Sequence, residues 1–290
     1  MSPDRLCILG AALLFSTGGT AIKATVLSGW QVAAFRSLLA AAFLWVALAG
    51  ARRFWSPRTL AVGACYAATL ILFVLGNKLT TAVNTIFLQS TAPLYLLVLG
   101  PWLLKESIRR TDVAFTLVMG LGLGLFFVGA DAPTALATNP SLGNLLGAIA
   151  GLTWAFTILG LRWLGGDGTQ RDAAAQAVIA GNLAAALVCA PMAFPVSPVG
   201  WLDWTLIGYL GLFQIGAAYI LMTRGMRGVP ALEASLLLLL EPVCSALWAW
   251  LFHGEQPGAW SLAGCALILV STFLRTVGPP ALAGHARHLR

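Results

Sequence analysis

Short polar breaks divide the sequence into ten apolar segments, each about as long as a lipid bilayer requires. A membrane-spanning helix needs about 20 consecutive apolar residues. Charged residues make up only 9% of the chain, against roughly a quarter in a soluble domain, so they are too few to cover a water-facing surface. The pattern predicts an all-α integral membrane protein with ten transmembrane helices. We place them at residues 5–24, 30–50, 59–77, 80–103, 112–130, 142–163, 173–192, 201–223, 229–252 and 257–275.

The basic residues predict which way these helices run. With the N-terminus in the cytoplasm, fourteen of the 17 Lys and Arg residues fall on the cytoplasmic side, and only Lys23 and Lys78 fall on the outer side. Basic residues collect in cytoplasmic loops, so we expect both termini inside, in the bacterial inner membrane. The net charge of +7 is then a topology signal, and we expect no nucleic-acid partner.

A proline and a glutamate recur at one fixed interval. Pro242 follows Pro93 by 149 residues, and Glu255 follows Glu106 by the same 149. Each proline falls within an apolar segment and each glutamate at a segment end. We interpret all four as structural or gating residues of a sequence repeat.

The repeat predicts the organisation of the chain. Ten spans divide into two sets of five, and an odd number per set forces the two sets into opposite orientations. Secondary transporters are commonly built from such inverted repeats, with the substrate near the bilayer midplane between them. The expected units are residues 1–133, residues 141–276 and a basic cytoplasmic tail, 277–290, that meets anionic lipid head groups.

Glu241 is the first candidate for function. Ionisable residues deep in a membrane are costly and mark function by default. Pro242 follows Glu241 and opens the helix one turn earlier, so a carboxylate and free backbone groups lie at one depth. Glu241 could exchange a proton, pair with a substrate amine, or make a structural hydrogen bond to a neighbouring helix. Its counterpart in the first repeat is Ala92, so a carboxylate function would be asymmetric.

Arg36 lies about a third of the way into the second span. Its guanidinium could bind an acidic group of the substrate. It could equally pair with a helix-end carbonyl or extend to the membrane interface, and we favour that structural or gating role.

Polar and aromatic residues within other spans are further candidates for substrate binding. Ser245 and Trp248 lie four and seven residues after Glu241, so the three share a helix face. A carboxylate, a hydroxyl and an indole on one face suit an amphipathic organic solute. The predicted binding set is Ser16, Thr20, Asn84, Gln89, Trp154, Thr157, Gln214, Tyr219, Glu241, Ser245 and Trp248.

Motifs of the common enzyme classes are missing from the sequence. It has no H-E-x-x-H, no G-x-S-x-G and no phosphate-binding loop. We therefore expect neither enzyme activity nor a metal or cofactor. Gly120 and Gly124 have the spacing of a helix-packing motif, which fits either a monomer or a homodimer.

Short segments in both halves form a recognisable series. They are Phe15-Ser16 with Ala21-Ile22-Lys23, Ala33-Ala34-Phe35-Arg36, Ala92-Pro93-Leu94, Leu104-Lys105-Glu106, Leu152-Thr153-Trp154-Ala155, Ala234-Ser235-Leu236, Leu240-Glu241-Pro242-Val243 and Gly254-Glu255. In their order and spacing these segments resemble the EamA-like members of the drug/metabolite transporter superfamily. Phe15 stands where the family often has Trp, and Lys105 where Gly often precedes the glutamate.

The resemblance implies two inverted five-helix repeats around a central cavity. Members of the family move amino acids, other metabolites, amines, nucleotide derivatives or toxic compounds, and some couple to protons. We expect a secondary transporter that exports a small amphipathic metabolite, such as an amino acid, by alternating access. The alternatives are a proton-coupled importer of a cationic metabolite, and a membrane sensor or enzyme subunit that does not transport.

Overall fold

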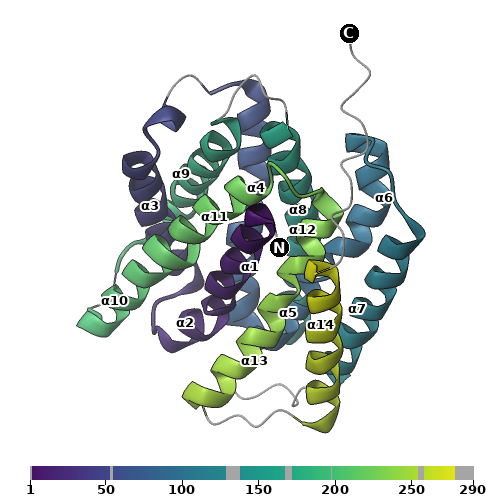
Figure 1. The fold of residues 1–290 in the computed structure, drawn as a ribbon. Helices are drawn as coiled ribbons and strands as arrows, with labels where there is room; N and C mark the ends of the chain where they lie inside the picture. Colours follow the sequence, from purple (N-terminus) through teal and green to yellow (C-terminus); the bar gives the residue numbers. More distant parts are fainter. Residues whose placement is uncertain are drawn as a thin grey trace.

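The computed structural model describes residues 2–52, 55–128, 138–166, 172–196, 198–253 and 258–277, and these residues contain helices and no strand. The predicted tail lies outside them beyond residue 277. The elements (Figure 1) are α1 (Pro3–Ser16), α2 (Gly18–Ala24), α3 (Gly29–Ala47), η1 (Ala49–Arg52), α4 (Pro57–Leu79), α5 (Ala82–Gln89), α6 (Ala92–Leu104), α7 (Arg110–Val128), α8 (Pro140–Gly166), α9 (Ala173–Ala193), α10 (Trp201–Tyr209), η2 (Leu210–Ala217), α11 (Ala218–Gly225), α12 (Ala231–Leu238), α13 (Leu240–His253) and α14 (Ala259–Val277).

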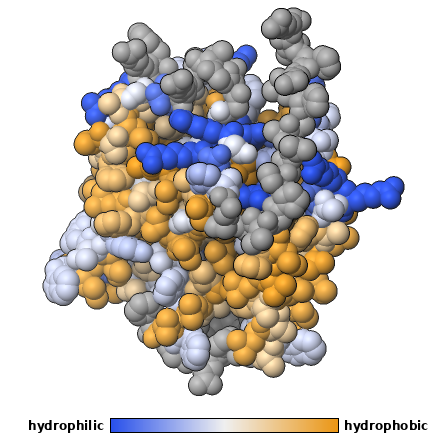
Figure 2. All heavy atoms as spheres, viewed as in Figure 1, coloured by the Kyte–Doolittle hydropathy of each residue, from blue (hydrophilic) through white to orange (hydrophobic). Residues whose placement is uncertain are grey.

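Eight helical stretches among the described residues are long and apolar enough to cross a membrane. They coincide with eight of the ten predicted spans. The other two, 112–130 and 257–275, coincide with α7 and α14, and as membrane crossings they stay predictions. In Figure 2 hydrophobic side chains cover the middle and lower surface, and hydrophilic ones gather toward the top. The chain is a multi-pass membrane protein.

Serine side chains cap the first helices of the chain. Ser28 Oγ accepts a hydrogen bond from the N–H of Gln31, whose side chain accepts one from the N–H of Ser28, which completes a capping box. Ser56 Oγ caps α4 by accepting a hydrogen bond from the N–H of Thr59, and Pro57 follows at the first helical position, where a missing N–H costs nothing. Local sequence thus fixes where these spans begin.

The 149-residue interval applies to the helix boundaries as well as to the landmark residues. Adding 149 to the bounds of α5 (82 and 89) gives those of α12 (231 and 238). The last residue of α6, Leu104, likewise maps onto the last residue of α13, His253. Both spans are therefore interrupted at the same place, at Ser90 in the first half and Leu239 in the second.

The two prolines account for these interruptions. Pro93 and Pro242 lie in the first turns of α6 and α13. Proline donates no backbone hydrogen bond, and its ring disfavours a helical residue before it. At the first break, Thr91 Oγ1 donates to the carbonyl of Leu88 over 2.6 Å and so satisfies one backbone acceptor that the break releases.

Polar contacts group the helix ends at two opposite ends of the bundle. At one, which we call the basic end, Arg5 pairs with Glu233 and Glu106 pairs with Arg162. At the other, the far end, Lys23 Nζ donates to the Thr80 carbonyl over 2.8 Å, and Asp203 Oδ1 accepts from Thr25 Oγ1 over 2.8 Å. Both ends thus hold segments that are distant in the sequence.

The two ends define the direction of the first helical stretch of each half. The stretch α1–α2 begins near Arg5 at the basic end and finishes near Lys23 at the far end. Its counterpart α8 begins near Asn144, which accepts from Thr80 at the far end, and finishes near Arg162 at the basic end. These two corresponding stretches therefore run in opposite directions between the two ends.

The main contacts between helices of the two halves have counterparts in which the corresponding helices have changed places. α4 packs against α8, and the corresponding α11 packs against α1. α5 and α6 contact α8, while α12 and α13 contact α1. The corresponding helices α3 and α9 contact each other, as do α7 and α14, which lie side by side in Figure 1.

The closest helix approach at α9 depends on two glycines. A Cβ atom built on Gly181 would lie 2.6 Å from the Gly63 carbonyl oxygen and 2.6 Å from Tyr66 Cδ1. Neither the backbone of α4 nor the buried ring of Tyr66 can move away without disturbing its neighbours. The glycines of the expected packing motif, Gly120 and Gly124, make no such close contact within the described residues, because a Cβ on either would meet nothing within 4 Å. Gly122, which lies between them, packs on α14 instead.

We predict that Gly181→Ala lowers the melting temperature of the detergent-purified protein by several degrees. The added methyl overpacks the contact between α4 and α9, at a typical cost of about 1–3 kcal/mol. The control is Gly208→Ala in α10, where the new Cβ has nothing within 4 Å and alanine favours the helix. Equal melting temperatures of the two variants would contradict the prediction.

Candidate functional site

Four of the spans (the first, fourth, eighth and ninth) contain an interruption of regular α-helix, and the four interruptions lie close together inside the bundle. α1 ends beside Phe15, α5 ends at Gln89, the π-helix η2 contains Gln214, and α13 begins beside Glu241. All four of these residues line one cavity. Irregular backbone inside a membrane is tolerated where it is buried in protein or lines a cavity, and π-helical turns are frequent at functional sites.

Both halves of the chain contribute to this central cavity. Its volume is about 40 Å³, enough for about three water molecules. An organic solute needs more space, so the helices must separate before one can enter. The lining residues are Phe15, Arg36, Thr69, Leu70, Phe73 and Gln89 from the first half and Trp154, Gln214, Ile215, Tyr219 and Glu241 from the second.

Aromatic rings form one wall of the cavity. The centroid of Phe15 lies 5.1 Å from that of Tyr219 and 6.1 Å from that of Trp154, both in edge-on geometry. Behind them Tyr66, which is fully buried, lies 4.5 Å from Tyr219 and accepts a hydrogen bond from Asn182. Such rings present π-faces that suit an apolar group or an organic cation.

Arg36 brings a cationic side chain to the cavity. It is 1% exposed. Its Nη2 donates to the Leu70 carbonyl over 3.2 Å and its Nη1 to Gln214 Oε1 over 3.4 Å. A Cβ on Gly18 would lie 2.7 Å from Gln214 Nε2, so the glycine after the break in span one makes room for this amide. Both acceptors of Arg36 are neutral.

Glu241 brings a carboxylate to the same cavity. It lies in the first turn of α13 and is half-buried. Among the described residues it takes part in no hydrogen bond or ion pair. The carboxylate is therefore available to a proton or to a solute.

Five of the predicted binding residues line the cavity: Gln89, Trp154, Gln214, Tyr219 and Glu241. Thr157 lies one layer away, with its hydroxyl oxygen 3.3 Å from that of Thr69, which does line the cavity. Arg36, for which we favoured a structural role, both bonds a helix carbonyl and lines the cavity.

Three other predicted residues join α1 to α13 instead. Ser245 Oγ donates to the carbonyl of Ser16, and Trp248 Nε1 donates to the hydroxyl of Ser16, each over 2.8 Å. None of the three is among the residues that line the cavity. They place α13, and with it Glu241, against the end of α1.

The remaining predictions fall at the far end or outside the described residues. Asn84 Nδ2 donates to Asn144 Oδ1 over 3.2 Å in the far-end polar cluster. Thr20 is half-buried in α2 and does not line the cavity. Glu255 lies outside the described residues.

Sequence reasoning missed Phe15, Thr69, Leu70, Phe73 and Ile215 as lining residues. Thr69 carried a usable signal, because a hydroxyl in mid-span needs a polar partner. The other four are apolar, and an apolar residue that faces a cavity looks the same in sequence as one that faces lipid.

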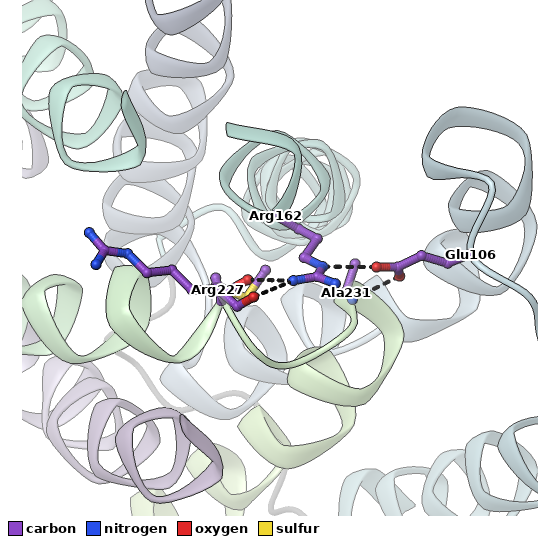
Figure 3. A network of polar contacts seen from close by, with 5 residues as sticks. Glu106, Arg162, Arg227 and Ala231 are labelled. Carbon is purple, nitrogen blue, oxygen red and sulfur yellow. Dashed lines mark hydrogen bonds and ion pairs between the residues drawn. The ribbon is translucent and has the colours of Figure 1, made fainter. Parts of the chain in front are cut away.

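A polar latch joins the two halves at the basic end (Figure 3). Glu106 Oε1 accepts from Arg162 Nε over 2.9 Å, and Glu106 Oε2 accepts from the N–H of Ala231, the first residue of α12, over 3.0 Å. Arg162 Nη1 also donates to the carbonyls of Met226 and Arg227 over 3.0 and 2.8 Å. A glutamate of the first half thus holds a helix start of the second half, where an acidic group is favoured.

The comparisons with known proteins agree with this architecture. The model of the EamA-like transporter family matches residues 5–128 and 141–277. The chain belongs to the EamA-like transporter family. This family is part of the drug/metabolite transporter superfamily, so the resemblance noted in the sequence is confirmed. The two matches cover the two halves whose helix boundaries repeat.

The similar proteins include transporters from a bacterium and an archaeon. "Uncharacterized transporter YwfM" of Bacillus subtilis (strain 168) is 27% identical over 94% of each chain. An "Uncharacterized transporter" of Archaeoglobus fulgidus is 27% identical over 71% of this chain and 75% of its own length. A solved crystal structure at 20% identity superposes with a TM-score of 0.74 and covers 94% of this EamA-like chain and 96% of its own, which shows the fold.

We predict that Glu106→Ala exposes the start of α12 to water. The change leaves Arg162 and the N–H of Ala231 without their shared acceptor. A cysteine at position 235, where the native serine is 2% exposed, should then react with a hydrophilic maleimide several times faster, in a background with the five native cysteines replaced by alanine.

The matched control for this labelling is Arg110→Ala. Arg110 is exposed at the start of α7, near the same end of the bundle. Equal labelling rates in the Glu106 variant, the control and the parent protein would mean that the latch does not hold α12 in place.

Proposed function

We propose that this protein is a secondary transporter of the bacterial inner membrane that moves small amphipathic metabolites, such as amino acids, by alternating access. In this proposal ten transmembrane helices form two inverted five-helix repeats with both termini in the cytoplasm. The basic end is then the cytoplasmic end, as the excess of basic residues in the loops favours. We propose export as the direction, in line with the family resemblance.

The repeat of the helix boundaries supports the inverted architecture. The bounds of α5 and α12 differ by the same 149 residues, and the corresponding stretches α1–α2 and α8 run in opposite directions between the two ends. Two such halves can exchange conformations, and each exchange would open one end of the bundle and close the other.

The central cavity is the observation that carries the proposal. It lies between the halves, is lined where four spans are interrupted, and combines aromatic, amide and charged side chains. At about 40 Å³ it is smaller than an amino acid requires, so in this proposal the halves move apart when a solute binds. The latch of Glu106 with Arg162 and α12 would close the cytoplasmic end in this conformation.

Glu241 would serve as the proton site or as the partner of a substrate amine. Its carboxylate lines the cavity, and the described residues offer it no counter-charge in contact. A proton would neutralise it when the cavity is empty, and an ammonium group would do so when the cavity is loaded.

Two alternatives remain testable beside export. The aromatic wall next to Glu241 also favours a purely cationic metabolite, which would be imported with coupling to protons. A sensor or enzyme subunit would bind a ligand in the cavity and move nothing. Tracer flux through the purified protein in proteoliposomes separates these cases, because a sensor gives binding without flux.

We predict that Glu241→Gln abolishes proton-dependent transport in proteoliposomes. The amide keeps the shape of the side chain but neither carries a charge nor exchanges a proton. Solute flux should fall at least tenfold, and the residual flux should no longer change with pH.

The control for the flux assay is Asp172→Asn. Asp172 precedes α9 and makes no side-chain capping bond, so this variant should transport at the parent rate. Unchanged flux and unchanged pH dependence in Glu241→Gln would remove the proposed role of Glu241.

A further inference from the structure

Arg36 carries a buried charge without an anionic partner. The ion pairs of Arg5 with Glu233 and of Arg162 with Glu106 both lie at the basic end, away from Arg36. Arg36 is 1% exposed and bonds only neutral acceptors. Buried charges in proteins are generally paired, and within a membrane span an unpaired one is a mark of function.

The guanidinium of Arg36 also has donors to spare. It carries five N–H groups, of which the two described bonds use two. Its Nε is buried and has no hydrogen-bond partner. Arginine binds carboxylates through two parallel N–H donors, and the Nε–H of Arg36 together with the second N–H of an Nη group would supply such a pair once the cavity opens.

The opposite charge in the same cavity is equally unmatched. Glu241 lines the cavity with Arg36, yet the two form no ion pair. The aromatic wall of Phe15, Trp154 and Tyr219 adjoins the same space. A purely cationic solute would leave Arg36 unpaired, and a purely anionic one would leave Glu241 unpaired. A solute that carries one charge of each sign matches both.

We propose that Arg36 is a specificity-determining residue that binds a carboxylate of the transported solute, so that the cavity selects zwitterions with the carboxylate at Arg36 and the ammonium group at Glu241. This inference rests on the proposed function, since it assigns the solute of that cavity. Gln214 would position the guanidinium, because its Oε1 accepts from Nη1 and its backbone lies in the π-helix that faces the cavity.

The test compares three ligands that share a side chain and differ in which charged groups they carry. Purified protein is screened against the twenty standard amino acids by thermal shift. Each amino acid that stabilises it is then compared, by calorimetric titration, with its decarboxylated amine and its deaminated acid. The wild type should bind the amino acid at least tenfold more tightly than either relative.

Two variants assign each charge to a residue. Arg36→Gln should lose at least tenfold in affinity for the amino acid while it binds the amine as the wild type does, which also shows that it is folded. Glu241→Gln should show the reverse, with the affinity for the deaminated acid retained. Arg36→Lys should restore part of the affinity, because it keeps the charge without the paired donors.

Three results would overturn the inference: no amino acid stabilises the protein, the amine binds the wild type as tightly as the amino acid, or Arg36→Gln keeps the full affinity for the amino acid. If Arg36→Gln does not fold, the three-ligand comparison on the wild type decides. If one of these three results is obtained and the protein nevertheless transports another solute in the tracer-flux assay, only the inference about Arg36 is refuted. If the three ligands bind as expected but no solute is transported, the transport proposal is refuted, and the recognition of the carboxylate by Arg36 is retained.

Discussion

The requirement that backbone polar groups be satisfied inside a membrane organises this structure. An unpaired N–H or C=O in lipid costs several kcal/mol, so a span stays helical unless protein surrounds the break. Here the breaks after Ser16, at Ser90 and at Leu239 and the π-helix Leu210–Ala217 all come together around one cavity. The backbone irregularities and the polar side chains therefore occupy the same part of the bundle.

The two halves repeat the scaffold but not the side chains that face the cavity. Glu241 corresponds to Ala92 at the 149-residue interval, and Tyr219 corresponds to Leu70. Helix boundaries and prolines are shared because they set the backbone path that two packed halves require. In the proposed transporter the lining residues are free to differ, because one cavity shared by the two halves would have to match an asymmetric solute.

Part of the candidate site was predictable, and its limits have a physical cause. Glu241, Gln214 and Gln89 were found because polar groups are costly in a span and need a reason to be there. The same rule selected Ser245 and Trp248, whose polar atoms instead bond Ser16 and join two helices. A mid-membrane polar residue satisfies the rule in either way, so sequence alone does not distinguish a cavity wall from a helix contact.

The sequence by itself determined the membrane class, the position of most spans and the repeat, because apolar length, proline chemistry and spacing are local properties of the chain. Only the tertiary structure decided that Arg36 and Glu241 share a cavity without pairing, and that Glu106 holds the start of α12. Those facts depend on how helices from the two halves pack. Residues more than a hundred positions apart meet there, and no local pattern records which side of each helix faces the partner half.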